Sequence, residues 1–387
     1  MSILIAGYPY IRESYFKTLR SYPEKDKLFF LLPKEWKIKD GKVVYHPPKD
    51  GNVSTVKAYF FHSHYPIIGG LLKGWMPGYF KFLLREKNKK NIEVVFTLTE
   101  PILLTTLYQA VIAKMLGLKH IFFTWENVSY DKFKGLNGLI KRVILNLNLT
   151  LSDGVICGNK KAEDIIKKIT NKNTAIIPLS GVDGNFFSPF KKERIFKGLD
   201  LKNKVVFSFV GSISYRKGIH VALEAFNNIL PEIPDATFII VGSGEYEKEI
   251  GRTMNTLGLA QSVHMIPWLS HDELKDLLAV SDVFLYPSLS YGGWEEQFGY
   301  SMAEASLMEL PVISTFSGSI EDIIINNKTG ILVEAGIEKE LGLAMIKLAK
   351  DINMRKVLGS NGRKYIIENY SYDVVATKFK EFFHSLK

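Results

Sequence analysis

The sequence predicts an α/β protein built from two doubly wound, Rossmann-like domains that face a central cleft. The chain has 387 residues, which is more than one compact core usually holds, so two domains of about 180 residues are expected. Short β-branched or aromatic runs alternate with helical patterns along the chain. This alternation is typical of parallel sheets with helices on both faces.

Two series of candidate strands define the elements of these domains. The first series comprises residues 3–6, 28–32, 58–62, 94–97, 120–124, 155–157 and 175–178. The second comprises residues 205–210, 237–241, 263–266, 283–286, 312–315 and 330–333. The polar segment 187–204 between them is the best linker candidate. We therefore expect an N-terminal domain over residues 1–188 and a C-terminal domain over residues 189–370.

Positive charge is concentrated in the first half of the chain. Residues 1–190 hold 28 Lys and Arg against 15 Asp and Glu, a net +13, whereas residues 191–387 hold 22 against 25, a net −3. This asymmetry suggests that the N-terminal half meets an anionic partner.

The pattern of the first residues and the cysteine usage favour a cytosolic protein. Residues 1–7 have the pattern of a first strand and not of a signal peptide. No apolar stretch reaches the roughly 18–20 residues that a membrane span needs. The single cysteine, Cys157, lies in an apolar run and cannot form an internal disulfide, which fits a reducing compartment.

Glu296 and Glu304 are the most informative pair of side chains. Gly299 between them allows a ligand close to the backbone, and residues 300–304 have the pattern of a helix start, where free N–H groups favour a phosphate anion. Two carboxylates beside an anion site suit a molecule with hydroxyls on both sides of a diphosphate, which is a nucleotide sugar. Taken alone, such a pair is more often a solvated helix face, so its surroundings decide.

Those surroundings resemble the donor-binding half of the group 1, or family 4, retaining glycosyltransferases. The run 281–288 precedes the pair, and 311–318, Glu321 and 329–333 follow it in the order and spacing of that family. The resemblance implies the GT-B architecture, with a nucleotide-diphosphate sugar in the C-terminal domain. It also implies a last helix, over residues 371–387, that crosses back to the N-terminal domain.

The resemblance implies roles for the residues around the glutamate pair. Glu304 would accept hydrogen bonds from the ribose hydroxyls, and Glu296 would contact the transferred sugar. Backbone N–H groups would meet the sugar near Phe298 and Gly299 and the phosphates near Tyr300 and Ser301. Such donors stabilise the charge that develops as the nucleoside diphosphate leaves.

A strand-end turn adds two cations to this donor side. Gly211 and Ser212 follow a predicted strand, and Arg216 and Lys217 lie at the start of the next helix, where cations are mildly unfavourable without a partner. The resemblance maps Lys217 onto the diphosphate lysine of the family. The family commonly has an arginine where this chain has Ser212, and Arg216 would supply that charge.

A second turn and a tryptophan are expected beside the nucleotide base. Gly242 and Gly244 belong to a glycine-rich turn after the next strand, and Trp268 ends the one after that. Trp268 packs either on the base or in the core.

The chain contains no Asp-x-Asp sequence, so we expect no metal and no other cofactor.

Polar residues also follow strands of the N-terminal half. Glu100 follows one strand, Glu126 and Asn127 follow the next, and Gly7 and Tyr8 close the first. Because this combination resembles a subset of the family, we expect the acceptor site here, with Glu126 in the catalytic set. Turn chemistry or helix capping is the alternative role for Asn127.

The segment 71–90 mixes aromatic and basic residues and suits an anionic membrane surface. Its alternative is a helix packed on the sheet with a solvated end. The aromatic residues are Trp75, Tyr79, Phe80 and Phe82, and the cations among them are Lys73, Lys81, Arg85 and Lys87.

The sequence thus predicts a metal-independent, retaining glycosyltransferase of the hexosyltransferase type, active in glycan biosynthesis on a lipid-linked or glycan acceptor. We expect it in the cytoplasm, peripheral at the inner face of the membrane. A nucleotide-sugar epimerase of the same fold is one alternative. A binding module whose basic half holds nucleic acid or another anion is a second, which the intact glutamate pair disfavours.

Overall fold

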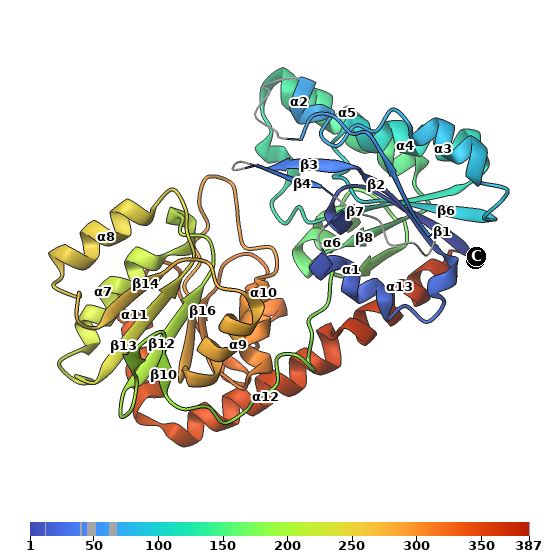
Figure 1. Ribbon diagram of the computed structural model, residues 1–387. Coiled ribbons are helices and arrows are strands. Elements are labelled where there is room, and N and C mark those ends of the chain that lie inside the picture. Colours follow the sequence, from blue (N-terminus) through green and yellow to red (C-terminus); the bar gives the residue numbers. More distant parts are fainter. Residues whose placement is uncertain (12, 39–40, 45–51, 62–67, 387) are drawn as a thin grey trace. The chain divides into compact units, whose positions relative to one another are not determined.

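The computed structural model describes residues 1–11, 13–38, 41–44, 52–61 and 68–386. The chain forms two compact units: unit 1 comprises Met1–Gly181 with Tyr372–Lys387, and unit 2 comprises Val182–Ser371 (Figure 1). The chain therefore passes between the units twice, after Gly181 and after Ser371. The sequence-based boundary lay a few residues later, between residues 188 and 189.

Unit 1 contains a seven-stranded parallel sheet in the order β5-β2-β1-β6-β7-β8-β9. Its strands are β1 (Ser2–Ala6), β2 (Leu28–Pro33), β5 (Val53–Val56), β6 (Ile92–Thr97), β7 (Lys119–Thr124), β8 (Gly154–Cys157) and β9 (Thr174–Ile176). A separate antiparallel pair joins β3 (Glu35–Ile38) to β4 (Gly41–Val44). The strand expected over 58–62 was wrong for the described residues 58–61, where only Tyr59 forms an isolated bridge, to Trp75. The edge strand of this sheet is β5, earlier in the chain, and residue 62 lies outside the described residues.

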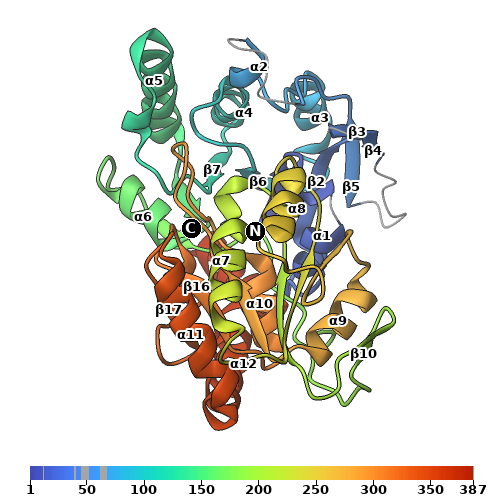
Figure 2. The same ribbon diagram turned by 90° about the vertical axis from the view of Figure 1, so that its left-hand side faces the viewer.

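Alternation along the strands of unit 1 builds a core on each face of the sheet. In β1, Ile3 and Ile5 join the core beneath α1 (Glu13–Arg20) and α13 (Tyr372–Ser385), whereas Leu4 and Ala6 join the core beneath α3 (Tyr79–Glu86) and α4 (Leu104–Met115). The helices α5 (Gly135–Leu151) and α6 (Lys160–Lys167) extend the second layer. Figures 1 and 2 show α3, α4 and α5 over the face opposite α1. The short helix α2 spans Ile68–Leu71.

Unit 2 contains a six-stranded parallel sheet in the order β14-β13-β12-β15-β16-β17. Its strands are β12 (Val205–Val210), β13 (Ala236–Val241), β14 (Val263–Ile266), β15 (Val283–Tyr286), β16 (Val312–Thr315) and β17 (Gly330–Val333). Its helices are α7 (Ile219–Ile229), α8 (Glu247–Thr256), α9 (His271–Val280), α10 (Tyr300–Leu307), α11 (Glu338–Lys350) and α12 (Ile352–Tyr370). Figure 1 shows α7, α8 and α11 on one face and α9 and α10 on the other.

These sheets confirm the predicted α/β class with two Rossmann-like units. In each sheet the strand order reverses around one strand, β1 in unit 1 and β12 in unit 2. Ligands of open parallel sheets bind beyond the carboxyl ends of the strands at such a reversal. The carboxyl edges of β12 and β15, and of β1 and β6, are therefore the places to look for sites.

The polar segment 187–204, predicted as a linker, instead belongs to unit 2. It forms the two-residue strands β10 (Ile195–Phe196) and β11 (Leu199–Asp200), which pair with each other. Arg194 anchors the segment, because its guanidinium donates to the Asp282 carboxylate at 2.7 and 3.2 Å. The many Lys and Arg residues of this segment made its composition look like that of a linker. One of them, Arg194, in fact attaches the segment to unit 2.

Candidate active site

A left-handed residue opens the central helix of the site. Gly299 has φ 82° and caps α10 at its N-terminus. A side chain would be strained at this φ, so glycine is required there. Phe298, just before it, is buried. Tyr300 and Ser301 form the first turn of α10, where backbone N–H groups have no partner within the helix. The helix start predicted from the sequence is therefore present, and its capacity to bind an anion stays a prediction.

A buried ion pair lies beside this helix start, at the carboxyl edge of β15. The Lys217 ammonium is 2.5 Å from Oε2 of Glu296, and both side chains are only 8% exposed. The same carboxylate oxygen accepts hydrogen bonds from the hydroxyls of Tyr286 at 2.9 Å and Ser288 at 3.2 Å. Lys217 also donates to the Tyr286 hydroxyl. The two predicted residues therefore form one hydrogen-bonded group with two residues that the sequence analysis did not assign.

The electrostatics of this group favour a charged Glu296. Burial would raise the pKa of its carboxyl, but the attraction of Lys217 and the hydrogen bonds from Lys217, Tyr286 and the Gln297 N–H outweigh burial and lower that pKa below its ordinary value. The Lys217 amine and the Glu296 carboxylate thus form a buried pair beside the start of α10.

Arg216 packs against an aromatic ring of a projecting turn. Its guanidinium carbon lies 3.7 Å from the centre of the Trp294 ring, and the Lys217 ammonium lies 5.3 Å from that ring. Trp294 and Tyr291 exchange backbone hydrogen bonds at 3.0 Å across Gly292 and Gly293, which both have positive φ. Trp294 is a further site residue that the sequence analysis missed, although the Gly-Gly pair before it is a turn signal.

Glu304 lies one turn into α10 and differs from Glu296 in having no charge partner. Its carboxyl has no hydrogen-bond or ion-pair partner among the residues that the structure describes, and burial alone raises its pKa to about 8. A carboxyl without a partner is costly in a protein unless a ligand supplies one. This residue is therefore the strongest indication of a ligand with hydroxyl donors.

The two glycine turns of the donor side touch each other through their backbones. A Cβ on Gly242, which has φ 141°, would lie 1.9 Å from the carbonyl oxygen of Gly211, and one on Gly244 would lie 2.2 Å from that of Ile213. Ser212 lies in the same turn as Gly211. Trp268 is 55% exposed, and its ring would be 3.7 Å from a Cβ on Gly242. This exposure removes the core-packing alternative for Trp268 and leaves the ring free to stack.

Unit 1 gathers its predicted residues at the carboxyl edge of its own sheet. Glu100 follows β6 and accepts hydrogen bonds from the Thr124 hydroxyl at 2.6 Å and the Trp125 N–H at 3.0 Å. Burial raises its pKa to about 7, against the lowering effect of those two donors. A carboxyl with this pKa is suited to proton transfer near neutral pH.

The other predicted residues of unit 1 follow β1 and β7 at the same edge of the sheet. Glu126, after β7, pairs with Lys132 at 2.7 Å and accepts from the Val128 N–H, and Asn127 beside it is buried. After β1, Gly7 has φ 148° and would place a Cβ 2.7 Å from that of Leu98. The Tyr8 ring stacks on Trp36, with centroids 4.1 Å apart.

The aromatic residues of segment 71–90 are only partly available to a membrane. Tyr79 and Phe82 are buried in the core, so their predicted role in apolar insertion was wrong. They face the sheet because α3 is amphipathic. Trp75 packs on Tyr108, with ring centres 4.3 Å apart, whereas Phe80 is 39% exposed. No helix within the described residues combines the length and the apolar character needed to cross a membrane.

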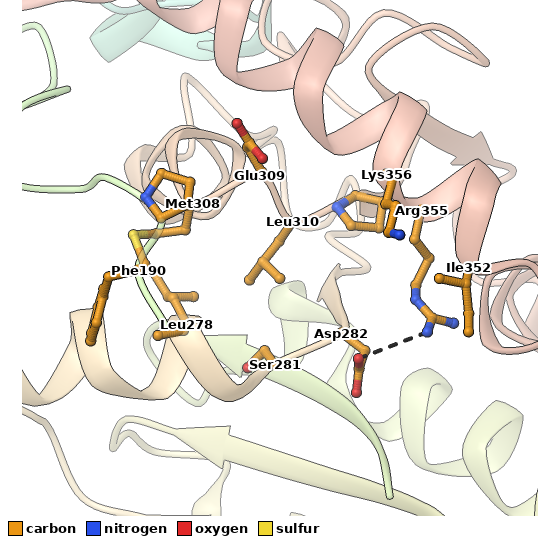
Figure 3. A pocket seen from close by; sticks show the side chains of 13 residues that line it. Phe190, Leu278, Ser281, Asp282, Met308, Glu309, Leu310, Ile352, Arg355 and Lys356 are labelled. Atoms are coloured by element: carbon orange, nitrogen blue, oxygen red, sulfur yellow. Dashed lines mark ion pairs between the residues drawn. The ribbon is translucent and has the colours of Figure 1, made fainter. Parts of the chain in front are cut away.

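A pocket of unit 2 lies at the opposite edge of the sheet from this site. It has a volume of about 300 Å³, and Asp282 and Pro311, which line it, precede β15 and β16. Figure 3 shows Asp282 beside Arg355, with 3.9 Å between their charged atoms. Because ligands of parallel sheets bind at the carboxyl edge, this pocket is not the donor site. No group of three or more possible metal ligands occurs among the described residues.

The fold, two Rossmann-like units that each contain a parallel sheet, is shared with solved glycosyltransferase structures. A structure of Anabaena Alr3699/HepE in complex with UDP is similar over 100% of both chains, with a TM-score of 0.77 and 18% identity. At that identity the likeness concerns the fold alone.

Residues 190–365 match the family model "Glycosyl transferases group 1", so this region is a group 1 glycosyltransferase domain. Capsular polysaccharide biosynthesis glycosyltransferase CapM of Staphylococcus aureus is 27% identical over 185 residues, 48% of this chain and 47% of that protein. A GDP-mannose-dependent alpha-(1-6)-phosphatidylinositol monomannoside mannosyltransferase of Mycobacterium tuberculosis (strain CDC 1551 / Oshkosh) is 28% identical over 206 residues, 52% and 54% of the two chains. The chain thus matches about half the length of these curated relatives.

Proposed function

We propose that this protein is a retaining, metal-independent glycosyltransferase of family 4 that moves a hexose from a nucleotide-diphosphate sugar to a lipid-linked or glycan acceptor. The observation that carries the proposal is the combination at one sheet edge of the Lys217–Glu296 pair, the start of α10 and the unpaired Glu304 carboxyl. A cation and a helix start suit a diphosphate, and the two carboxyls suit hydroxyls on either side of it.

Each donor residue has a chemical task in this proposal. Glu304 accepts hydrogen bonds from the ribose, and Trp268 packs on the base beside the turns of Gly242 and Gly244. Glu296 binds the sugar hydroxyls, and the N–H groups at the start of α10 bind the sugar and the phosphates. Lys217 and Arg216 stabilise the negative charge that grows on the diphosphate as the bond to the sugar breaks. We assign no side chain as a nucleophile.

The acceptor is proposed to bind at the polar edge of unit 1. Glu100, with its pKa of about 7, would accept the proton of the acceptor hydroxyl or orient that hydroxyl, and Glu126 and Asn127 would complete the site. Gly7 and Tyr8 border the same edge. The positive charge of the N-terminal half favours an acceptor that carries phosphate, or one held at an anionic membrane. We place the enzyme in the cytoplasm, at the inner face of the membrane.

Two similar proteins agree with this donor class. The Anabaena neighbour has been solved in complex with UDP-glucose, and the mycobacterial relative is described as GDP-mannose-dependent. Both donors are nucleotide-diphosphate sugars. They differ in base and in sugar, so the proposal names the class of donor and not the individual donor.

The proposal is tested by sugar transfer from a panel of nucleotide sugars into lipid-linked and soluble glycan acceptors, in excess chelator. The anomeric configuration of the product, measured by NMR, tests retention. A product with inverted configuration, or a strict need for Mg²⁺ or Mn²⁺, would contradict this mechanism.

The epimerase alternative is supported by one observation, the Glu100 carboxyl with its pKa of about 7, because epimerisation needs a group that exchanges protons near neutral pH. An epimerase converts one nucleotide sugar into another without an acceptor. Analysis of the nucleotide sugars after incubation with the enzyme alone distinguishes the two reactions.

A further inference from the structure

One helix of unit 1 exposes a continuous apolar stripe that no part of the described chain covers. On α5, five large apolar side chains are 37–74% exposed, and they occur at spacings of three and four residues, so they share an arc of about 100° on the helix. They are Leu136, Leu139, Ile140, Val143 and Leu147.

The opposite face of α5 is built into the core. Gly138, Ile144, Leu145, Asn148 and Leu149 are buried, and Leu145 and Leu149 join the same cluster as Phe122 and Val155 of the sheet. The helix is therefore apolar on both sides, one side facing the protein and one facing outward. A helix that is apolar all round is normally covered on all sides, and a large exposed apolar patch marks an interaction site.

The charges along this helix define the partner. Between residues 132 and 152 the chain has four cations and no Asp or Glu: Lys132, Lys134, Lys141 and Arg142. Lys141 and Arg142 belong to α5 itself. Lys132 is paired with Glu126, so Lys134, Lys141 and Arg142 supply the excess positive charge beside the stripe. An apolar stripe with such an excess complements a surface that has an apolar interior and anionic headgroups.

We propose that the exposed stripe of α5 is the surface through which this protein docks on an anionic lipid bilayer, with Leu139 and Val143 at its centre inserted among the acyl chains. The neighbouring helices support this orientation. α4 packs against α5 and exposes Val111 and Met115, and α3 exposes Phe80 and Leu84. All three helices lie over one face of the sheet (Figure 2). This inference rests on the proposed function, because a lipid-linked acceptor lies in a membrane. It moves the expected membrane contact from segment 71–90 to α5.

The test is co-sedimentation of the full chain with vesicles of equal parts phosphatidylglycerol and phosphatidylcholine, compared with phosphatidylcholine alone. The α5 variant is Leu139→Ser/Val143→Ser, whose side chains are 52% and 50% exposed. The matched control is Leu343→Ser/Val357→Ser on α11 and α12 of unit 2, at 59% and 58%. A third variant, Phe80→Ser/Leu84→Ser, tests α3.

Wild type should bind the anionic vesicles and release them in about 1 M salt, where screening shortens to about 3 Å. The α5 variant should bind at least roughly tenfold more weakly, because two apolar side chains no longer insert. The unit 2 control should bind like wild type. Wild type that stays in the supernatant overturns the proposal, and so does a loss of binding in the α3 variant alone.

Two further measurements separate this proposal from its neighbours. If the stripe instead contacts a second copy of the chain, wild type sediments as a dimer without vesicles and the α5 variant as a monomer, which overturns the lipid assignment. Calorimetry of the same proteins with ADP, CDP, GDP, TDP and UDP tests the donor site independently. A wild type that binds vesicles but none of these nucleotides would contradict the proposed function and leave the docking surface intact.

Discussion

The carboxyl edges of the two sheets stabilise their buried carboxyl groups in different ways. In unit 2, Glu296 is held ionised by Lys217, and both side chains are 8% exposed. In unit 1, Glu100 has hydroxyl and N–H donors but no ammonium within ion-pair distance among the described residues, and its pKa rises to about 7. The difference teaches which task each edge can perform: fixed charges suit binding of a diphosphate sugar, and a carboxyl near neutrality suits exchange of a proton.

The largest expected effect concerns the buried pair of unit 2. Lys217→Met leaves Glu296 charged and without its partner, so unfolding free energy should fall by about 3–5 kcal/mol. The double change Lys217→Met/Glu296→Gln should recover most of that loss. Urea unfolding of the three proteins, followed by fluorescence and circular dichroism, measures these differences.

The matched comparison is the ion pair between Lys132 and Glu126 in unit 1. Lys132 and Glu126 are 26% and 16% exposed, so solvent screens their attraction, and Lys132→Met should cost about 1 kcal/mol or less. Equal losses for the two lysine changes would show that the two edges do not differ as described.

The next effect concerns ligand affinity at Glu304. If its carboxyl accepts hydrogen bonds from the ribose, Glu304→Ala should weaken nucleoside diphosphate binding by roughly 1–3 kcal/mol without unfolding the protein. Titration calorimetry measures the affinity, and Glu100→Ala in unit 1 is the control. Unchanged affinity in the Glu304 variant would remove the residue from the donor site.

The pH dependence of stability follows from the same residue. Burial raises the pKa of Glu304 to about 8 from an ordinary 4.5. Between pH 4.5 and pH 8 the folded state therefore keeps a proton on this carboxyl that the unfolded state has lost. Stability from this group is fully present below pH 4.5 and is lost as pH rises through 8. Above pH 8, Glu304→Gln should therefore be more stable than wild type by roughly 1–2 kcal/mol after allowance for solvent screening.

Thermal unfolding between pH 5 and pH 9 checks that sign. The stability curves of wild type and Glu304→Gln should converge toward low pH and separate toward high pH. A constant difference across the range would mean that the Glu304 carboxyl titrates normally in the folded protein.

The smallest expected effect concerns the acceptor edge. Glu100→Gln should leave nucleoside diphosphate affinity unchanged, because the donor residues belong to unit 2, while it lowers the rate of transfer and removes a titration near pH 7 from the rate profile. Calorimetry and a pH–rate profile measure the two quantities. A fall in donor affinity with an unchanged rate profile would reverse the assignment of the two edges.

The fold of unit 2 and the helix start at Gly299 were largely predictable because they depend on local patterns. Every strand expected in the second half of the chain corresponds to a strand of unit 2 within one residue at each end. Gly299 was identifiable because its neighbours define a helix start. Glu296 and Glu304 were singled out because the runs before and after them resemble a known family, and their roles stay predictions. Each of these patterns involves residues that are close in the sequence, so it predicts the local structure directly.

The missed features depend on contacts between distant parts of the chain. Tyr286 ends β15, and Ser288 and Trp294 lie in the loop that follows it. Their side chains belong to the site only because of their contacts with Glu296 and Arg216, which the sequence does not show. Which side of α3 is buried was not resolved either, so Tyr79 and Phe82 were assigned to a membrane and not to the core. Both faces of α5 carry large aliphatic residues, and only the structure shows which face is buried.

The most direct test of the central claim is a thermal-shift screen of nucleoside diphosphates and their sugars in excess EDTA, because a ligand bound only to the folded state raises stability by RT ln(1 + [L]/Kd). The account predicts that at least one nucleoside diphosphate and a sugar derivative of it raise the melting temperature of wild type. It also predicts that Glu304→Ala loses most of that shift and that Glu100→Gln keeps it. No shift with any nucleotide, or an equal shift in wild type and Glu304→Ala, would contradict a donor site at the carboxyl edge of unit 2.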